Sequence, residues 1–114
     1  GDLEAAIESY KKALKIKPDY AQAYNNMGSA LSEKGDLEAA IESYKQALKI
    51  KPDYAQAYNN IGSALAEQGR LEEAIVHFEQ AINFDSNYRA AQKNLALARS
   101  LVGKSNARVQ QEIR

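Results

Sequence analysis

Apolar residues recur about every 3.6 positions along this chain, and the pattern itself repeats. Residues 21–54 read AQAYNNMGSALSEKGDLEAAIESYKQALKIKPDY, and the same unit starts again at Ala55 with AQAYNNIGSALAEQ. The segment 1–20 matches the segment 35–54 except at Lys12, which stands where Gln46 does. No stretch alternates as a strand would. A period of about 34 residues, as from Ala21 to Ala55, predicts an array of packed helix pairs.

Turn-forming residues divide the pattern into helices. Prolines and glycines are expected to end helices, and aspartates to begin them as N-caps. These residues are, in chain order, Asp2, Pro18, Asp19, Gly35, Asp36, Pro52, Gly69 and Gly103. The predicted helices cover about residues 3–16, 20–34, 37–50, 54–68, 71–84 and 88–102. Gly28, inside a helix, is unfavourable by up to ~1 kcal/mol against alanine, so we expect a neighbouring helix to approach closely there.

The spacing of small and large residues resembles the tetratricopeptide repeat signature. The residues that carry the resemblance are Tyr24, Met27, Gly28, Leu31, Ala40, Tyr44 and Pro52, and then Tyr58, Ile61, Gly62, Leu65, Ala74 and Phe78, with Ser86 where proline is expected. The resemblance implies an all-α, right-handed superhelical solenoid of antiparallel helix pairs. It also implies that the first helix of each pair lines the concave side.

The resemblance divides the chain into units. Residues 1–20 are a half repeat holding only a second helix, and residues 21–54 and 55–88 are full repeats. Residues 89–102 are expected to be a C-terminal capping helix, because Gln92 and Arg99 place polar groups on the face that would pack against a further helix. Solvating that face is what a terminal repeat must do.

Residues 103–114 form a tail that is either a short helix or a frayed segment, since short isolated helices are marginal. In a helix, Val109 and Ile113 would share one side. We expect the tail to fold back and cover an apolar stripe on the preceding helix. That stripe consists of Ala90, Asn94, Leu97 and Leu101. The alternative is that the stripe forms an apolar pocket for a side chain of a partner.

Composition argues against several classes of function. The 15 basic and 15 acidic residues cancel, which disfavours general attraction to nucleic acid or to an anionic membrane. Cysteine is absent and His77 is the single histidine, so a thiolate or histidine metal site is not expected. We expect a non-catalytic protein with no cofactor and no metal, located in the cytoplasm. The chain opens in mid-repeat at Gly1, so targeting by a segment upstream stays open.

A polar stripe on the first helices is the strongest functional signal. It consists of Gln22, Asn26, Ser29 and Glu33, and one period later of Gln56, Asn60, Ser63 and Glu67. Asn25 and Asn59 lie beside it, and Asn94 continues it on the last helix. The stripe faces away from the packing face that holds Tyr24 and Leu31. In a tetratricopeptide stack it would therefore line the concave surface.

Asn26, Asn60 and Asn94, each one period apart, form what we call the asparagine ladder. Asparagine is a poor helix former, and its carboxamide both donates and accepts hydrogen bonds. The ladder resembles the one that lines the repeat domain of O-linked N-acetylglucosamine transferases, which implies binding of an extended peptide through its backbone. Two alternatives are that these asparagines bond only to neighbouring helices, or that duplication copied them.

A second resemblance fails. Tetratricopeptide domains that hold the acidic tails of heat-shock chaperones clamp two carboxylates with lysine, arginine and asparagine. Asn60 fits the central asparagine, but the clamp's basic positions fall at Asn25, Ala90 and Asn94. Arg89 and Lys93 nearby leave only a weak anion site.

The sequence thus predicts a scaffold that binds a peptide or an extended protein segment. The predicted groove residues are Gln22, Asn25, Asn26, Ser29, Glu33, Gln56, Asn59, Asn60, Ser63, Glu67, Lys93 and Asn94. Replacing Asn60 by alanine is expected to weaken binding with little loss of fold. The alternatives are a weakly self-associating module joined through its terminal helices, and a targeting module of a larger enzyme such as a glycosyltransferase.

Overall fold

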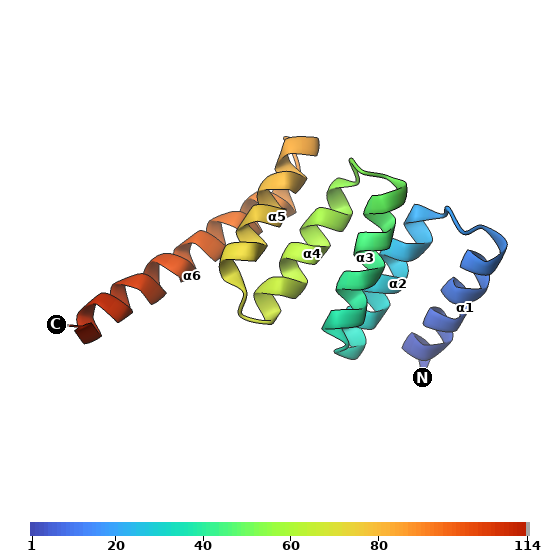
Figure 1. The fold of residues 1–114 in the computed structure, drawn as a ribbon, viewed down its shortest axis with the longest axis horizontal. Coiled ribbons are helices and arrows are strands. Elements are labelled where there is room, and N and C mark those ends of the chain that lie inside the picture. The colour runs from blue at the N-terminus through green and yellow to red at the C-terminus, as the bar shows by residue number, and fades with distance from the viewer. Residues whose placement is uncertain (114) are drawn as a thin grey trace.

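Residues 1–113, which are the part of the chain that the structure describes, form six α-helices and no strand in a computed structural model. The helices are α1 (Asp2–Ile16), α2 (Ala21–Lys34), α3 (Leu37–Ile50), α4 (Ala55–Glu67), α5 (Leu71–Phe84) and α6 (Arg89–Ile113). The first five begin and end within one residue of the predicted positions. The predicted all-α solenoid of antiparallel helix pairs is confirmed (Figure 1).

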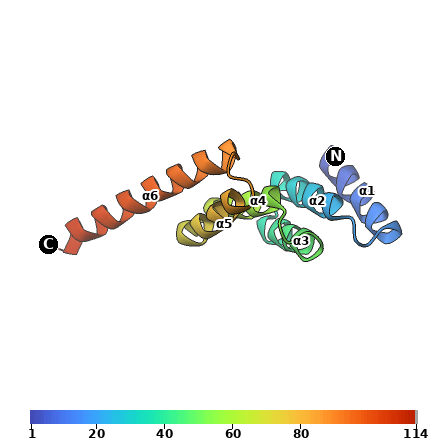
Figure 2. The ribbon, with the colours of Figure 1, turned by 90° about the horizontal axis from the view of Figure 1, so that it is seen from above.

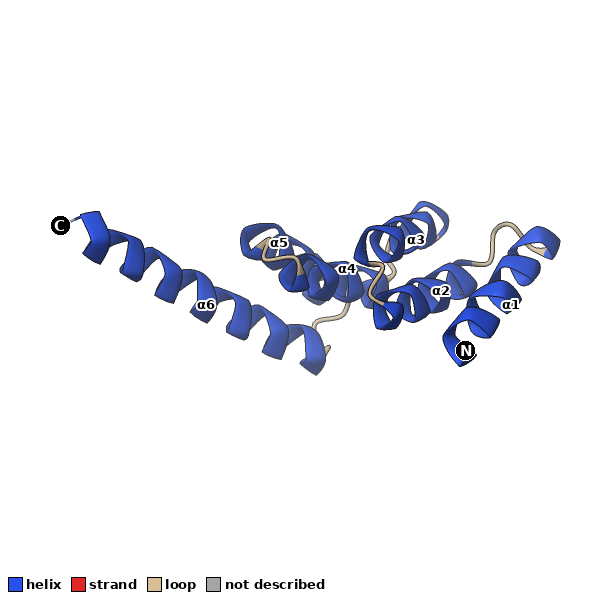
Figure 3. Ribbon diagram, turned by 90° about the horizontal axis from the view of Figure 1, so that it is seen from below, coloured by secondary structure: helices blue, strands red, loops and turns tan. Residues whose placement is uncertain are grey.

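The stack is curved. Helix α2 packs against α3 and α4 packs against α5, while α1 and α6 cover the two ends (Figure 1). Backbones of the first helices approach one another, α2 to α4 and α4 to α6. Within residues 1–113, no such approach joins α1 to α3 or α3 to α5. The layer of α2, α4 and α6 is therefore the inner, concave side, and α3 and α5 lie on the outer side (Figures 2 and 3).

Two glycines let the helices of each pair approach closely. A Cβ on Gly28 would lie 2.5 Å from the Tyr44 ring, and one on Gly62 would lie 2.5 Å from the Phe78 ring. Both rings belong to one core cluster that also contains Ala40. The expectation that a neighbouring helix approaches Gly28 is confirmed.

Two of the three glycines expected to end helices do so. Gly35 and Gly69 have φ values of 95° and 81°, the left-handed region that favours glycine. The Ala39 backbone N–H donates to the Asp36 carboxylate at 3.3 Å, as a capping residue requires. The expected caps at Asp2 and Asp19 are wrong: Asp2 lies inside α1, and the N-cap of α2 is Tyr20, without a side-chain cap bond.

Helix α6 does not stop at Gly103, contrary to the prediction. It runs unbroken to Ile113 and projects beyond α5 (Figure 1). Leu37 follows Gly35 by two positions, and Leu71 follows Gly69 by two positions. Both leucines pack on the core, so the chain reverses direction after each glycine. The corresponding residue after Gly103 is Ser105, which is exposed. With no apolar residue to bury, the chain continues as a helix.

The expectation that the tail folds back is therefore wrong. Val109 and Ile113 lie on the same helix as the apolar stripe and are exposed. The expected boundary between a capping helix of residues 89–102 and a tail of residues 103–114 is not a break in the backbone, although Arg114 lies outside the described residues. Among residues 1–113, no helix is both long enough and apolar enough to cross a lipid bilayer.

Candidate functional site

The polar stripe lies on α2 and α4, the helices of the inner layer. Its end residues are exposed and its middle residues are half-buried. The exposed ones are Gln22, Glu33, Gln56 and Glu67, and the half-buried ones are Asn26, Ser29, Asn60 and Ser63. On α6, Lys93 is exposed and Asn94 is half-buried. The structure thus brings the asparagine ladder onto three helices of one layer.

Asn25 and Asn59 are not exposed to a groove, which corrects their prediction as binding residues. They are only 5% and 7% exposed. The Asn60 Nδ2 group donates to the Asn25 Oδ1 atom at 3.0 Å, and the Asn94 Nδ2 group donates to the Asn59 Oδ1 atom at 3.1 Å. The two buried amides therefore tie each first helix to the next, because a buried polar group must find a partner.

Tyr54 and Tyr88, which directly precede α4 and α6 and stand one period apart, extend this network. The Asn59 Nδ2 group donates to the Tyr88 hydroxyl at 3.4 Å, and Asn25 and Tyr54 occupy the same two positions one period earlier. Burial raises the pKa of Tyr54 and of Tyr88, with the bonds from asparagine opposing that shift. The ordinary tyrosine pKa is already about 10, so both phenols stay protonated at neutral pH and the network is uncharged.

Each ladder asparagine keeps hydrogen-bonding capacity beyond this network. A carboxamide offers two N–H donors and a carbonyl oxygen with two lone pairs. Asn60 uses one N–H on Asn25, and its Oδ1 atom and other N–H are free of side-chain bonds within residues 1–113. Asn26 makes no side-chain hydrogen bond within the same residues. Bonding between helices and binding a ligand are compatible roles for these side chains.

The two serines of the polar stripe have different surroundings. The Tyr44 hydroxyl donates to the Ser29 Oγ atom at 3.4 Å, and Ser29 donates to the Asn25 carbonyl oxygen at 3.3 Å. One repeat later the tyrosine is replaced by Phe78, which has no hydroxyl. Ser63 instead borders a cavity.

That cavity lies between α4, α5 and α6 and has a volume of about 200 Å³. Its lining residues are Ser63, Ala66, Leu71, Phe78, Asn94, Leu97, Ala98 and Leu101. Leu97 and Leu101 are 60% and 42% exposed because the tail does not cover them. The sequence identified the stripe on α6 but missed the contributions of α4 and α5. The change from Tyr44 to Phe78 one period later was the available signal.

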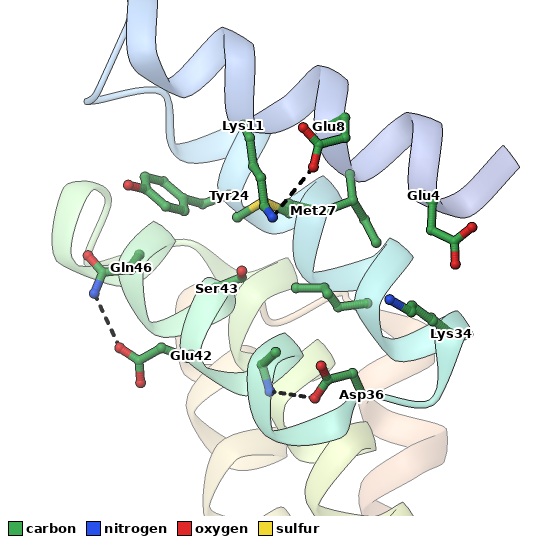
Figure 4. A pocket seen from close by; sticks show the side chains of 13 residues that line it. Glu4, Glu8, Lys11, Tyr24, Met27, Lys34, Asp36, Glu42, Ser43 and Gln46 are labelled. Atoms are coloured by element: carbon green, nitrogen blue, oxygen red, sulfur yellow. Dashed lines mark hydrogen bonds and ion pairs between the residues drawn. The ribbon is translucent and has the colours of Figure 1, made fainter. Parts of the chain in front are cut away.

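Another cavity, of about 550 Å³, lies on the outer side between α1 and α3 (Figure 4). Met27 and Leu31 are among its apolar lining residues, and charged side chains of both signs, such as Glu42 and Lys34, line it as well. A counterpart between α3 and α5 is lined by the residues one period on, including Ile61 and Leu65. Such a cavity therefore recurs between the second helices of successive repeats and results from the spacing of those helices.

His77, the single histidine, lies on α5. The Nδ1 atom of His77 lies 2.9 Å from the Glu73 carbonyl oxygen, and its ring lies 6.2 Å from that of Tyr58. In the described residues, no group of three histidine, cysteine, aspartate or glutamate side chains is placed to hold a metal ion.

A curved stack of helix pairs with a polar inner face defines a helical-repeat protein. Two protein-family models match the chain. The family described as "TPR repeat" matches residues 1–35 and 28–69, and the family described as "Tetratricopeptide repeat" matches residues 55–88. The chain belongs to the tetratricopeptide repeat family. No curated protein matches it significantly.

Solved structures of similar fold include three proteins. MamA is 30% identical with a TM-score of 0.82, and the match covers 93% of this chain and 62% of that one. The Sgt2 TPR domain from Aspergillus fumigatus is 25% identical with a TM-score of 0.88, covering 93% and 72%. The first TPR of Spaghetti (RPAP3), solved bound to the HSP90 peptide SRMEEVD, is 23% identical with a TM-score of 0.86, covering 90% and 82%. The chain thus spans less than two thirds of MamA.

Proposed function

We propose that this chain is a non-catalytic scaffold that binds an extended peptide or protein segment along the inner face of α2, α4 and α6. The observation that carries the proposal is the asparagine ladder: half-buried amides at one position of successive inner helices, each retaining donors and an acceptor. The structurally similar RPAP3 domain holds a peptide, which supports this use of the fold. The absence of cysteine suits a cytoplasmic location.

The buried asparagines support this proposal by orienting the ladder. Since Asn25 and Asn59 hold the amides of Asn60 and Asn94, those side chains are fixed before a ligand arrives. Orientation in advance lowers the entropy lost on binding. Each amide bond to a peptide backbone contributes only about 1 kcal/mol net. Binding by the ladder would therefore be modest and largely independent of the peptide's sequence.

Replacing Asn26 by alanine is expected to weaken peptide binding about fivefold, a loss of about 1 kcal/mol, without lowering stability. Asn26 has no side-chain bond to lose within residues 1–113, and alanine is the better helix former. Replacing Asn60 by alanine should weaken binding similarly. Contrary to the expectation from the sequence, it should also destabilise the fold by about 1–3 kcal/mol, because the buried Asn25 oxygen loses its donor. Affinity is measured by fluorescence polarisation, with peptides that have been selected from a display library for binding to this chain.

Asn83 provides the matched control, because it is an exposed asparagine on α5, in the outer layer. The change Asn83→Ala should leave the affinity unaltered. If Asn26→Ala binds the selected peptides as tightly as the parent chain does, the ladder is only a structural feature and the proposal fails.

Self-association through the end helices finds little support in the geometry. If α1 of a second copy packed on α6 as α3 packs on α2, its Tyr10 would face Ala96, which stands where Gly28 and Gly62 do. A Cβ at Gly28 would lie 2.5 Å from the Tyr44 ring, so the Ala96 Cβ would meet Tyr10 in the same way. Arg99, at the same end, is held by Glu79 at 2.9 Å. We therefore favour peptide binding over assembly.

A further inference from the structure

The cavity between α4, α5 and α6 differs in chemistry from the same place one repeat earlier. Four of its lining positions change from polar to apolar over one period. The changes are Ser32 to Ala66, Tyr44 to Phe78, Ser63 to Leu97 and Glu67 to Leu101. The corresponding Leu37 and Leu71 do not differ, and neither do Asn60 and Asn94. The apolar character is therefore a property of this one place in the stack and not of the repeat.

The cavity is also continuous with the asparagine ladder, because Asn94 of the ladder and Ser63 of the polar stripe line it. It holds no charged side chain. An apolar cavity of about 150 Å³ is large enough to hold benzene, so the 200 Å³ here has room for one leucine-sized side chain. A peptide lying along the ladder would reach this cavity where the ladder ends, at Asn94 on α6.

The helix that borders the cavity is basic, whereas the remainder of the chain is acidic. Residues 1–88 contain 9 basic and 14 acidic residues, a net charge of −5. Residues 89–114 contain 6 basic and 1 acidic, a net charge of +5. Lys93, Lys104 and Arg108 share a helix face with Leu97 and Leu101, since they are spaced by three, four or seven positions. Within residues 1–113, no ion pair engages these three cations.

We propose that this end of the groove selects an acidic peptide by seating one apolar side chain in the cavity, with the peptide's carboxylates placed against Lys93, Lys104 and Arg108. The inference rests on the proposed function and adds the chemistry of the partner. The apolar side chain covers Leu97 and Leu101, and the cations on both sides of the cavity provide charge complementarity, which fixes the register of the peptide.

The test uses the full chain and fluorescently labelled short unstructured peptides of defined composition. The parent peptide carries aspartate and glutamate around a central leucine. One matched peptide replaces leucine by serine, and another replaces the acids by asparagine and glutamine. The chain variant Leu97→Ser/Leu101→Gln removes the apolar walls without adding charge, and both sites are exposed enough to be replaced with little effect on folding. Ile16→Gln, at an exposed site on α1, is the matched control.

The parent peptide is expected to bind the unaltered chain, with an affinity that falls as salt screens the charges. The cavity variant should lose about 10-fold or more, as burial of a leucine side chain implies. The serine peptide should lose as much, and Ile16→Gln should lose nothing. The variant Lys93→Gln/Lys104→Gln should reduce the dependence on salt.

Equal binding of the leucine and serine peptides, or unchanged binding by the cavity variant, would overturn the inference. So would failure of the parent peptide to bind at millimolar concentration. A mass by light scattering that doubles for the unaltered chain but not for the cavity variant would assign the cavity to a second copy instead. If Asn26→Ala weakens binding and the cavity variant does not, the proposed peptide binding along the ladder is supported. In that case only the inference that the cavity selects an apolar side chain fails.

Discussion

Replacing Phe78 by alanine is expected to lower the free energy of unfolding by about 3–5 kcal/mol. The ring is 2% exposed and packs over Gly62 between α4 and α5, in the cluster that joins the two repeats. Its removal leaves a cavity that rigid helices on both sides cannot close. Because domains of this size are stable by only about 5–15 kcal/mol, the loss is large. Urea denaturation followed by circular dichroism measures it.

Phe84 provides the comparison, since it is the other phenylalanine and is half exposed at the end of α5. It stacks on Tyr58 with ring centroids 5.6 Å apart, so Phe84→Ala should lose part of that contact and no more than about 1.5 kcal/mol. Equal losses for the two changes would show that the packing around Phe78 does not hold the repeats together.

We expect two glycine-to-alanine changes to have opposite effects on stability: Gly62→Ala should destabilise the chain and Gly103→Ala should stabilise it. At Gly62 the new Cβ would lie 2.5 Å from the buried Phe78 ring, and overpacking of this kind costs about 1–3 kcal/mol. Better helix propensity offsets up to about 1 kcal/mol of that cost. At Gly103 nothing lies within 4 Å and the residue is inside α6, so alanine should stabilise the chain by up to about 1 kcal/mol.

Chemical denaturation of both variants decides this prediction, and a double variant tests its cause. Phe78→Leu should restore part of the stability of Gly62→Ala, because the two sites are in contact and their effects are coupled. Stabilisation by Gly62→Ala would mean that the ring moves aside freely. Destabilisation by Gly103→Ala would mean that Gly103 needs a conformation that alanine does not adopt.

The fold could be predicted from the sequence because each element is specified locally and then repeated. Tyr44 and Gly28 are a large and a small residue at the spacing that the family signature requires, and the structure places one against the other. The extension of α6 could not be predicted from Gly103 alone. The glycine ends a helix only when an apolar residue two positions later packs on the core, and Ser105 lacks that capacity.

The candidate site could be predicted only in outline. The helical period of the pattern placed Asn26, Asn60 and Asn94 on one layer of helices, but it could not separate Asn60 from Asn59. Adjacent asparagines differ by about 100° around a helix, and which one is buried depends on the crossing of α2, α4 and α6. The cavity beside Leu97 likewise depends on three helices that are distant in sequence.

Binding of a peptide on the inner face of the stack can be located residue by residue in solution. The most direct measurement is the change of backbone and side-chain amide NMR shifts as a display-selected peptide is added to isotope-labelled chain. Perturbations centred on the amides of Asn26, Asn60 and Asn94 are the predicted result. Perturbations confined to the outer side, around Glu8 and Glu42 of the cavity between α1 and α3, would contradict it.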